Sequence, residues 1–467
     1  MLLRMNNPLH VISPVDGRYS EYTKDLASIF SEAGLMRFRV LVESEYLIAL
    51  SELRSTDLRK FSKKEKELVR SLYAVPFKDA QIIHEIESVG YKHIKATNHD
   101  VKAVEYYMAE KLAHTSLRDC VSWLHFALTS EDTNNLAYGI MMSAGLEQTL
   151  IPMLKKISVA LHGFAKMYAD VPMLSRTHGQ PATPTTFGKE WRVFAKRVDR
   201  GLRTLEAFQI SVKLNGATGN YNAHVAAYPK IDWMKFTARF VKTLNTISAS
   251  SLEPNFFTTQ IESHDSYAEL FDILRHVNTI LIGLNQDIWR YISDGWIIQR
   301  SIEGEVGSST MPHKVNPIRF ENSEGNLGVA NALCSHFSNK LPISRLQRDL
   351  SDSTVERNFG VAFAHSLIGY AYLLQGLGQI EVHSGEALRT LQNHPEVIAE
   401  AIQTILRREG ASLPYEKLKE LTRGKKLTLQ DLHSFISALH VSRKVKKELL
   451  AITPENYLGI ASKLAKL

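Results

Sequence analysis

Cysteine is scarce in this sequence, because only Cys120 and Cys334 occur among 467 residues. The two stand far apart and outside any CxxC pair, which argues against a disulfide framework and against a cysteine zinc site. Long hydrophobic runs are lacking too, since no apolar stretch approaches the roughly 18 residues that a membrane span needs. The start, MLLRMNNPLHVIS, holds too short an apolar stretch for a signal peptide. We therefore expect a cytoplasmic protein.

Charge of one sign is not gathered in any long segment. The net charge is +7 and the isoelectric point about 9.1, a balance that would suit an anionic partner. The basic residues are spread along the chain apart from short runs at Lys63–Lys66 and Arg443–Lys447, which are typical of solvated helix faces. We therefore expect no nucleic-acid binding. Hydrophobic residues at 44% and charged residues at 22% are ordinary for a globular protein.

Several established site motifs are also missing. GEVGSST lacks the Gly-Lys-Ser/Thr ending of a phosphate-binding loop, and GATGN at 216–220 follows no strand, as a dinucleotide fingerprint would. Neither HExxH nor Gly-x-Ser-x-Gly occurs. The histidines His84, His93, His99 and His178 share no metal-ligand spacing. We therefore expect no metal and look to acid–base chemistry.

Apolar residues at steps of three and four dominate the middle of the chain. One series comprises Leu270, Leu274, Val277, Leu281, Leu284, Ile288 and Tyr291. Similar series run from Phe187 to Val212 and from Phe363 to Leu377. This spacing predicts bundle helices of about 25–35 residues, whereas strand-like alternation is sparse. We predict an all-α fold built on a long-helix bundle.

The organisation of the chain suggests three parts. We predict an N-terminal helical domain at 1–118, a central long-helix bundle at 119–385 and a small helical C-terminal domain at 386–467. Helices as long as the central ones cannot be wrapped by one small domain. We therefore expect them to pack against copies of the same chain in an oligomer.

Polar segments interrupt the helical pattern at seven places. They are VDGRYS (15–20), TNHDVKAVEY (97–106), HFALTSEDTNN (125–135), SRTHGQPATP (175–184), FTTQIESHD (257–265), GSSTMPHKVNP (307–317) and RDLSDSTVERN (348–358). Any one of them could simply cap a helix, since Thr97–Asp100 has the form of a capping box and Ser353 or Thr354 could begin a helix. Together they favour a functional site. His178, in a turn beside glycine and proline, is a natural proton carrier.

The segment GSSTMPHKVNP has the composition of a closing loop. Pro312 and Pro317 exclude a helix interior and a central strand, because proline lacks the backbone N–H. Glycines on one side and prolines on the other are typical of a lid, although a solvated linker is the alternative. Lys314 and Asn316 would supply a cation and an amide donor to a carboxylate on which charge develops.

This segment resembles the signature G-S-S-x-M-P-x-K-x-N-P of the fumarase/aspartase superfamily. The other six segments make the sequence similar to the adenylosuccinate lyase family of bacterial type, from about residue 12 to the C-terminus. The resemblance implies an all-α homotetramer with a central helical core and active sites shared between subunits. It also implies β-elimination of fumarate from adenylosuccinate, giving AMP, and from the succinylated ribotide SAICAR, giving AICAR. These reactions belong to purine nucleotide biosynthesis and need no cofactor.

The same resemblance implies roles for individual residues. Ser308 matches the general base, with Ser309 as the local alternative, and Lys314 would help to lower the pKa of the serine. His178 matches the general acid that protonates the leaving nitrogen, and His99 assists it. The other substrate-binding candidates are Arg18, Tyr19, Asn98, Asp100, Thr129, Ser130, Gln260, Met311, Asn316, Asn322, Arg348, Ser353, Thr354 and Arg357. Among them, the arginines suit a phosphate through their paired N–H groups.

Two other readings stay open. Another lyase of the superfamily, acting on argininosuccinate, aspartate or malate, would share the loop but have no phosphate for Arg348 and Arg357 to bind. An inactive helical homologue could serve as an assembly or RNA-binding protein. Such a scaffold would have no use for Ser308, His178 and Lys314 together.

Overall fold

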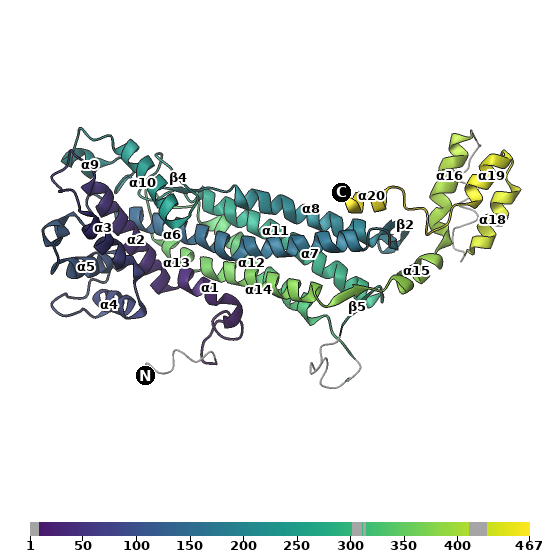
Figure 1. Cartoon of the computed structure of the whole chain (residues 1–467), viewed down its shortest axis with the longest axis horizontal. Helices are drawn as coiled ribbons and strands as arrows, with labels where there is room; N and C mark the ends of the chain where they lie inside the picture. The colour runs from purple at the N-terminus through teal and green to yellow at the C-terminus, as the bar shows by residue number, and fades with distance from the viewer. Residues whose placement is uncertain (1–8, 301–310, 312–313, 411–426) are drawn as a thin grey trace. The chain divides into compact units, whose positions relative to one another are not determined.

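The computed structural model describes residues 9–300, 311, 314–410 and 427–467. Helices make up most of it (Figure 1), which confirms the all-α prediction. The helices are α1 (Ser20–Phe30), α2 (Glu32–Ser51), α3 (Lys63–Ser71), η2 (Leu72–Ala74), α4 (Phe77–Ser88), α5 (Asp100–Leu112), η3 (Arg118–Trp123), α6 (Ser130–Gly145), η4 (Leu146–Leu150), α7 (Ile151–Met167), α8 (Phe187–Glu206), α9 (Asn222–Ala227), α10 (Trp233–Ser248), α11 (Asp265–Ser293), α12 (Ile318–Lys340), α13 (Ser351–Glu356), α14 (Phe359–Leu377), α15 (Ser384–Gln392), η5 (Pro395–Ile398), α16 (Ala399–Arg408), α18 (Leu429–Ala438), α19 (Arg443–Leu450) and α20 (Ala461–Lys466).

Short strands form two-stranded pairs between the helices. They are β1 (Pro172–Thr177), β2 (Gln180–Thr186), β3 (Ile210–Val212), β4 (Leu252–Pro254), β5 (Ile297–Gln299) and β6 (Ile380–Val382). The pairs β1–β2 and β5–β6 are antiparallel and β3–β4 is parallel. No helix among the described residues is both long and apolar enough to span a bilayer.

The chain folds into two compact units. Unit 1 comprises Met1–Leu154, Gly201–Thr279 and Gly325–Ala371, and unit 2 comprises Lys155–Arg200, Ile280–Glu324 and Tyr372–Leu467. The predicted domain borders at 118 and 385 follow a different division and stay a prediction.

The core of unit 1 contains aromatic contacts between α11, α12 and α14. The ring centroid of Phe271 lies 4.7 Å from that of Phe337 and 5.0 Å from that of Phe359. Two buried hydrogen bonds also join α11 to α14. The Tyr370 hydroxyl donates to Asn278 Oδ1 at 2.6 Å, and Asn278 Nδ2 donates to Ser366 Oγ at 3.1 Å. Satisfied polar groups of this kind add specificity to an otherwise apolar seam.

The predicted seam of α11 is confirmed, since its leucine, valine and isoleucine members are all buried. This helix has 29 residues, or roughly 43 Å at 1.5 Å per residue. The series that starts at Phe187 was extended too far, because α8 ends at Glu206 after 20 residues and Val212 lies in β3. Ile210 and Val212 are buried because alternate side chains of the strand β3 point to the same face. In the sequence, their spacing could not be told apart from the end of a helical series. With 19 residues, α14 is also shorter than predicted.

We expect His224 of α9 to make the protein less stable in mild acid. Its side chain is buried beside Tyr46 and Trp233, and burial lowers its pKa from 6.5 to about 4. Asp132 and Lys213 are the charged groups that face it. Between pH 6.5 and pH 4, His224 is protonated in the unfolded chain but stays neutral in the folded one. Its contribution to the free energy of unfolding is therefore present above pH 6.5 and is lost as the pH falls towards 4. Between pH 7 and pH 5 the loss amounts to roughly 2 kcal/mol.

The measurement is urea unfolding at one protein concentration, at pH 7 and at pH 5, for the wild type and for His224→Gln. The variant should lose about 2 kcal/mol less than the wild type between the two pH values. Equal losses in the two proteins would contradict the assignment.

Candidate active site

The imidazole of His99 bridges the starts of two helices in unit 1. His99 is the N-cap of α5, and its Nδ1 accepts the N–H of Lys102 at 3.3 Å. Its Nε2 lies 3.4 Å from Ser130 Oγ at the start of α6. Because Nδ1 accepts, the proton of the neutral ring lies on Nε2 and faces Ser130. The ring is half exposed, so it combines a fixed tautomer with access for a ligand.

The predicted capping box at Thr97–Asp100 is wrong. Asn98 has a left-handed backbone with φ of 47°, so the helix begins two residues later than predicted and His99, not Thr97, is its N-cap. The Thr97 hydroxyl instead bonds to the backbone N–H and C=O of His99. Helix capping therefore falls on the histidine for which the resemblance predicts a role in chemistry.

The first turn of α6 is fixed by a buried ion pair. The Thr129 N–H donates to Asp132 at 2.9 Å, and the Asp132 carboxylate accepts Lys213 Nζ at 2.7 Å, with both side chains fully buried. Asp132 also accepts the N–H of Gly216 at 3.1 Å, which gives the GATGN segment a structural role. Thr129 and Ser130 are thus presented from a rigid helix start.

Asp100 and Arg357 connect α5 to the end of α13. The Asp100 carboxylate accepts Arg39 Nη2 at 2.7 Å and Arg357 Nη2 at 3.1 Å, while Arg357 Nη1 donates to Ser353 Oγ at 2.7 Å. Burial alone would raise the pKa of Asp100, but the charge of Arg39 and the hydrogen bonds hold it below its usual value. Ser353 and Thr354 lie inside α13, and its N-cap is Leu350, so neither begins that helix as one alternative held.

Arg348 forms a second contact group, with Gln260 and Glu131. Its Nη1 donates to Gln260 Oε1 at 3.5 Å, and its Nη2 lies 3.3 Å from Glu131 Oε2. Because Ser130 and Glu131 are consecutive, this group adjoins the His99 group. Four of the polar segments predicted from the sequence therefore meet in unit 1.

Two hollows flank this meeting point. One of about 580 Å³ is lined by Val15, Asp16 and Ser20 of the first polar segment, by the preceding Ser13 and by Arg357. Arg18 is exposed on the same turn, and Tyr19 directly precedes α1. The DGRY turn and Arg357, more than 300 residues apart in sequence, thus line one hollow.

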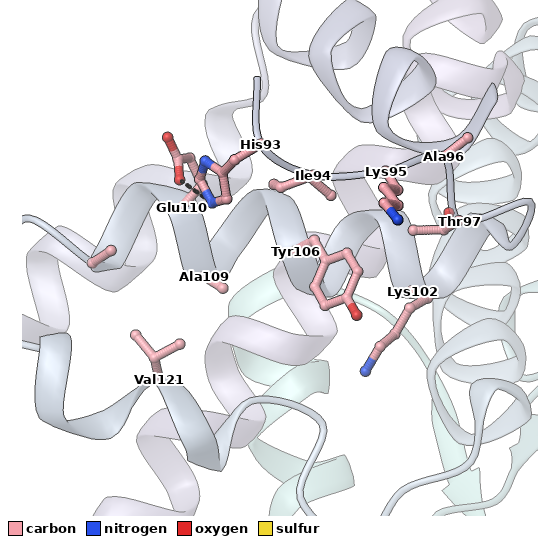
Figure 2. Close-up of a pocket in the computed structure, with 11 residues that line it drawn as sticks. His93, Ile94, Lys95, Ala96, Thr97, Lys102, Tyr106, Ala109, Glu110 and Val121 are labelled. Atoms are coloured by element: carbon pink, nitrogen blue, oxygen red, sulfur yellow. Dashed lines mark ion pairs between the residues drawn. The ribbon is translucent and has the colours of Figure 1, made fainter. Parts of the chain in front are cut away.

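The second hollow, of about 610 Å³, is lined by residues 93–97, which precede His99 in the chain (Figure 2). Its wall comes from residues 93–97 and from one face of α5, where Lys102 Nζ lies 5.1 Å from the ring centroid of Tyr106. Lys102 also pairs with Glu105 at 2.7 Å. Thr97 and Lys102 of the second polar segment line this hollow, whereas His99 is not among its lining residues.

In unit 2, His178 occupies the tip of the β1–β2 hairpin. Thr177 pairs with Gln180, which leaves His178 and Gly179 as the two-residue turn. Their φ angles are 53° and 75°, the geometry of a type I′ turn, which favours glycine at both positions. Histidine accepts local strain there, and its ring is exposed. A strained, exposed residue at a tight turn is a candidate for function.

The far end of the signature segment leads into α12. Gln299 Nε2 of β5 donates to the Val315 carbonyl at 3.2 Å, which ties this end to the β5–β6 pair. Met311 and Lys314 are exposed, Asn316 is half-buried, and Asn322 lies half-buried in α12. Ser308, Ser309 and Pro312 fall outside the described residues, so the predicted lid and the predicted base stay predictions.

Comparisons with known proteins place these motifs in one family. A family model described as lyase matches residues 17–331, and one described as adenylosuccinate lyase C-terminal matches residues 344–458. Curated adenylosuccinate lyases of Legionella pneumophila (strain Corby) and Escherichia coli (strain K12) are 47% and 46% identical, covering 98% and 97% of both chains. That of Dictyostelium discoideum is 48% identical, with 98% of both chains covered. The chain belongs to the adenylosuccinate lyase family.

Solved structures agree on the fold. A fumarate lyase of Mesorhizobium sp. BNC1 superposes with a TM-score of 0.72 at 17% identity, covering 95% of this chain and 96% of that one. A 3-carboxy-cis,cis-muconate lactonizing enzyme of Pseudomonas putida has a TM-score of 0.72 at 20% identity, covering 96% and 97%. The adenylosuccinate lyase family membership confirms the identification made from the sequence and assigns the chain to the lyases.

Sequence reasoning missed the buried acidic groups behind the adenylosuccinate lyase motifs. Glu131, Asp352 and Glu356 are at most 4% exposed and lie near the buried His264. Burial raises the pKa of Glu131 and Glu356 and lowers that of His264, so these groups favour their neutral forms. One side-chain ligand atom from each of Glu131, His264 and Glu356 lies within 4.8 Å of the other two, and carboxylates and imidazole are residue types that bind metals. The predicted absence of a metal therefore stays a prediction. The sequence offered one signal for them, because all four residues lie inside the polar segments identified above.

Proposed function

We propose that this protein catalyses the adenylosuccinate lyase reaction of purine nucleotide biosynthesis. It splits adenylosuccinate into AMP and fumarate, and SAICAR into AICAR and fumarate. The observation that carries the proposal is the identity of 46–48% to curated adenylosuccinate lyases over nearly the whole chain. The contact groups around Arg348 and Arg357 in unit 1 support a substrate that bears a phosphate. Argininosuccinate, aspartate and malate have no phosphate.

The proposed chemistry needs one base and one acid. Ser308 as alkoxide takes the proton from the carbon beside a carboxylate, and the electron pair moves into that carboxylate as an aci-carboxylate dianion. The pair then returns to form the C=C bond of fumarate as the C–N bond breaks, and His178 gives a proton to the departing nitrogen. Lys314 and backbone N–H groups would lower the pKa of the serine. His99 assists the acid.

The binding roles divide the substrate into two halves. In the proposal, Thr129, Ser130, Lys314 and Asn316 hold the carboxylates that become fumarate, and Gln260 contacts the succinyl part. Fixed donors aimed at growing negative charge supply much of the rate in such reactions. The phosphate and ribose contacts are Arg18, Tyr19, Arg348, Ser353 and Arg357, and the remaining candidates near the substrate are Asn98, Asp100, Met311, Asn322 and Thr354.

We also propose a cytoplasmic homotetramer with active sites shared between subunits, acting without cofactor, membrane or nucleic acid. Large apolar side chains near the Gln260 and Arg348 segments support assembly, because Phe257 and Leu346 are 93% and 89% exposed and Leu350 is also exposed. Exposed apolar side chains gathered in one region favour contact with another protein surface. Light scattering after gel filtration measures the assembly, and a monomeric mass would exclude it.

The test of the activity is direct. Purified protein is mixed with adenylosuccinate without added metal or cofactor, and AMP and fumarate are followed by ultraviolet absorbance and chromatography. Parallel samples contain SAICAR, argininosuccinate, aspartate and malate. Turnover of the two purine substrates alone is the expected result. Turnover of only a small substrate would replace the proposal by another lyase activity, and no turnover by the folded protein would favour a scaffold.

We expect Arg357→Ala to raise KM for adenylosuccinate by about 10–100-fold with a smaller change in kcat. A charge-assisted hydrogen bond is worth about 1.5–3 kcal/mol, and Arg39 keeps Asp100 paired in the variant. Product inhibition provides a second measurement. AMP should inhibit Arg357→Ala less strongly than the wild type, whereas fumarate should inhibit both proteins equally.

Arg345→Ala is the matched control, because Arg345 lies three residues before the segment that holds Arg357 and its side chain is 82% exposed. An unchanged KM in Arg357→Ala, or an equal loss of inhibition by AMP and fumarate, would remove the phosphate role.

A further inference from the structure

The hairpin that carries His178 is braced along its length by C-terminal elements of unit 2. Helix α15 packs against β1, while η5 and α20 pack against β2, as the labels of β2 and α20 in Figure 1 also show. The five residues at its tip, 176–180, are exposed. The position of the tip therefore depends on how the rest of the hairpin is held.

A bulge in β2 provides the first anchor. Met173 pairs with Thr185 and Ser175 pairs with Ala182, so β2 has one more residue than β1 between these pairs. Such a bulge redirects a side chain out of the regular ladder. Thr183, in the bulge, donates from its hydroxyl to Glu400 Oε2 of α16 at 2.6 Å. The same carboxylate oxygen accepts the Tyr457 hydroxyl at 3.0 Å.

Helix α20 provides the second anchor, at both ends of the hairpin. Lys466 Nζ lies 2.7 Å from a carboxylate oxygen of Asp170, which stands two residues before β1. Arg192, in α8 just after β2, donates to the Ala465 carbonyl from Nε at 2.9 Å and from Nη2 at 2.6 Å. Ala465 is fully buried, so α20 is seated on unit 2 as well as tethered to it.

These anchors add little to global stability, because exposed ion pairs and hydrogen bonds contribute little each. Their effect falls instead on the direction in which the turn presents its imidazole. A displacement of about 1 Å in a proton donor can cost roughly 10²-fold in rate. We propose that Glu400 and Lys466 are positioning residues that fix the His178 hairpin for proton transfer. The inference rests on the proposed function and on His178 as its acid.

Three variants test it in the full-length protein: Glu400→Ala, Glu400→Gln and Lys466→Ala. Controls are Arg407→Ala on α16 and Lys463→Ala on α20, both at exposed positions. We expect the two alanine variants at Glu400 and Lys466 to lower kcat about 5–50-fold, with KM within about twofold. Glu400→Gln should recover most of the rate, since its amide oxygen still accepts the Thr183 hydroxyl. The melting temperature should shift by no more than about 2 °C, as for a minor surface change.

Hydrogen–deuterium exchange of residues 172–186 adds a readout that does not need activity. Faster exchange confined to this hairpin in the alanine variants is the expected result. Unchanged kcat in Glu400→Ala and Lys466→Ala, or no rescue by Glu400→Gln, would overturn the positioning role. A wild type without adenylosuccinate turnover would instead refute the proposed function, while the exchange data would still show whether the anchors hold the hairpin.

Discussion

Removal of the His178 ring is expected to lower kcat for adenylosuccinate by about 10²–10⁴-fold while the protein stays folded. The leaving nitrogen departs easily only if it gains a proton as the C–N bond breaks. An exposed imidazole at the tip of a tight turn is placed to deliver that proton. Because His178 has φ of 53°, alanine would add backbone strain, so His178→Asn is the better replacement. Asparagine tolerates the left-handed region and keeps the turn.

Steady-state kinetics of His178→Asn and His178→Ala measures the effect. His276→Ala is the control, since His276 is an exposed histidine of α11 outside the polar segments. Added imidazole should restore part of the rate in the alanine variant by replacing the missing acid. Activity within a few-fold of the wild type in both variants would refute the assignment.

Ser308→Ala should reduce kcat by about 10²–10⁴-fold as well. Here the lost step is removal of the proton from carbon, the step that an alkoxide must perform and that alanine cannot. The loss should appear in kcat with little change in KM, because the serine is proposed to act on the transition state and not to hold the substrate.

Ser309→Ala is the matched control for the base, one residue away in the same segment. Exchange of the substrate C–H proton in heavy water separates the two catalytic steps. His178→Asn should retain more exchange than turnover, whereas Ser308→Ala should lose both. If Ser309→Ala loses both and Ser308→Ala keeps them, the base is Ser309.

The sequence alone predicted features that depend on residues close together in the chain, and it missed features that depend on distant ones. The seam of α11 follows from side chains three and four residues apart, and its burial was predictable because that spacing is local. The end of α8 was not, since β3 pairs with β4 some 40 residues later and apolar spacing records no such partner. The cap at His99 was missed because the left-handed backbone of Asn98 shifts the N-cap by two residues, from Thr97 to His99.

The sequence by itself determined the all-α class, the family and the residues that carry its motifs. These depend on residue types at fixed spacing. Only the tertiary structure decided that His99 faces Ser130, that Arg357 joins Asp100 to Ser353, and that Glu131 lies buried against Arg348. It also decided that a bulge in β2 ties the His178 hairpin to Glu400. Apart from the Arg357–Ser353 bond, which spans four residues, each of these contacts joins residues far apart in the chain. The burial that raises the pKa of Glu131 arises from the same distant packing, which no local pattern of residue types contains.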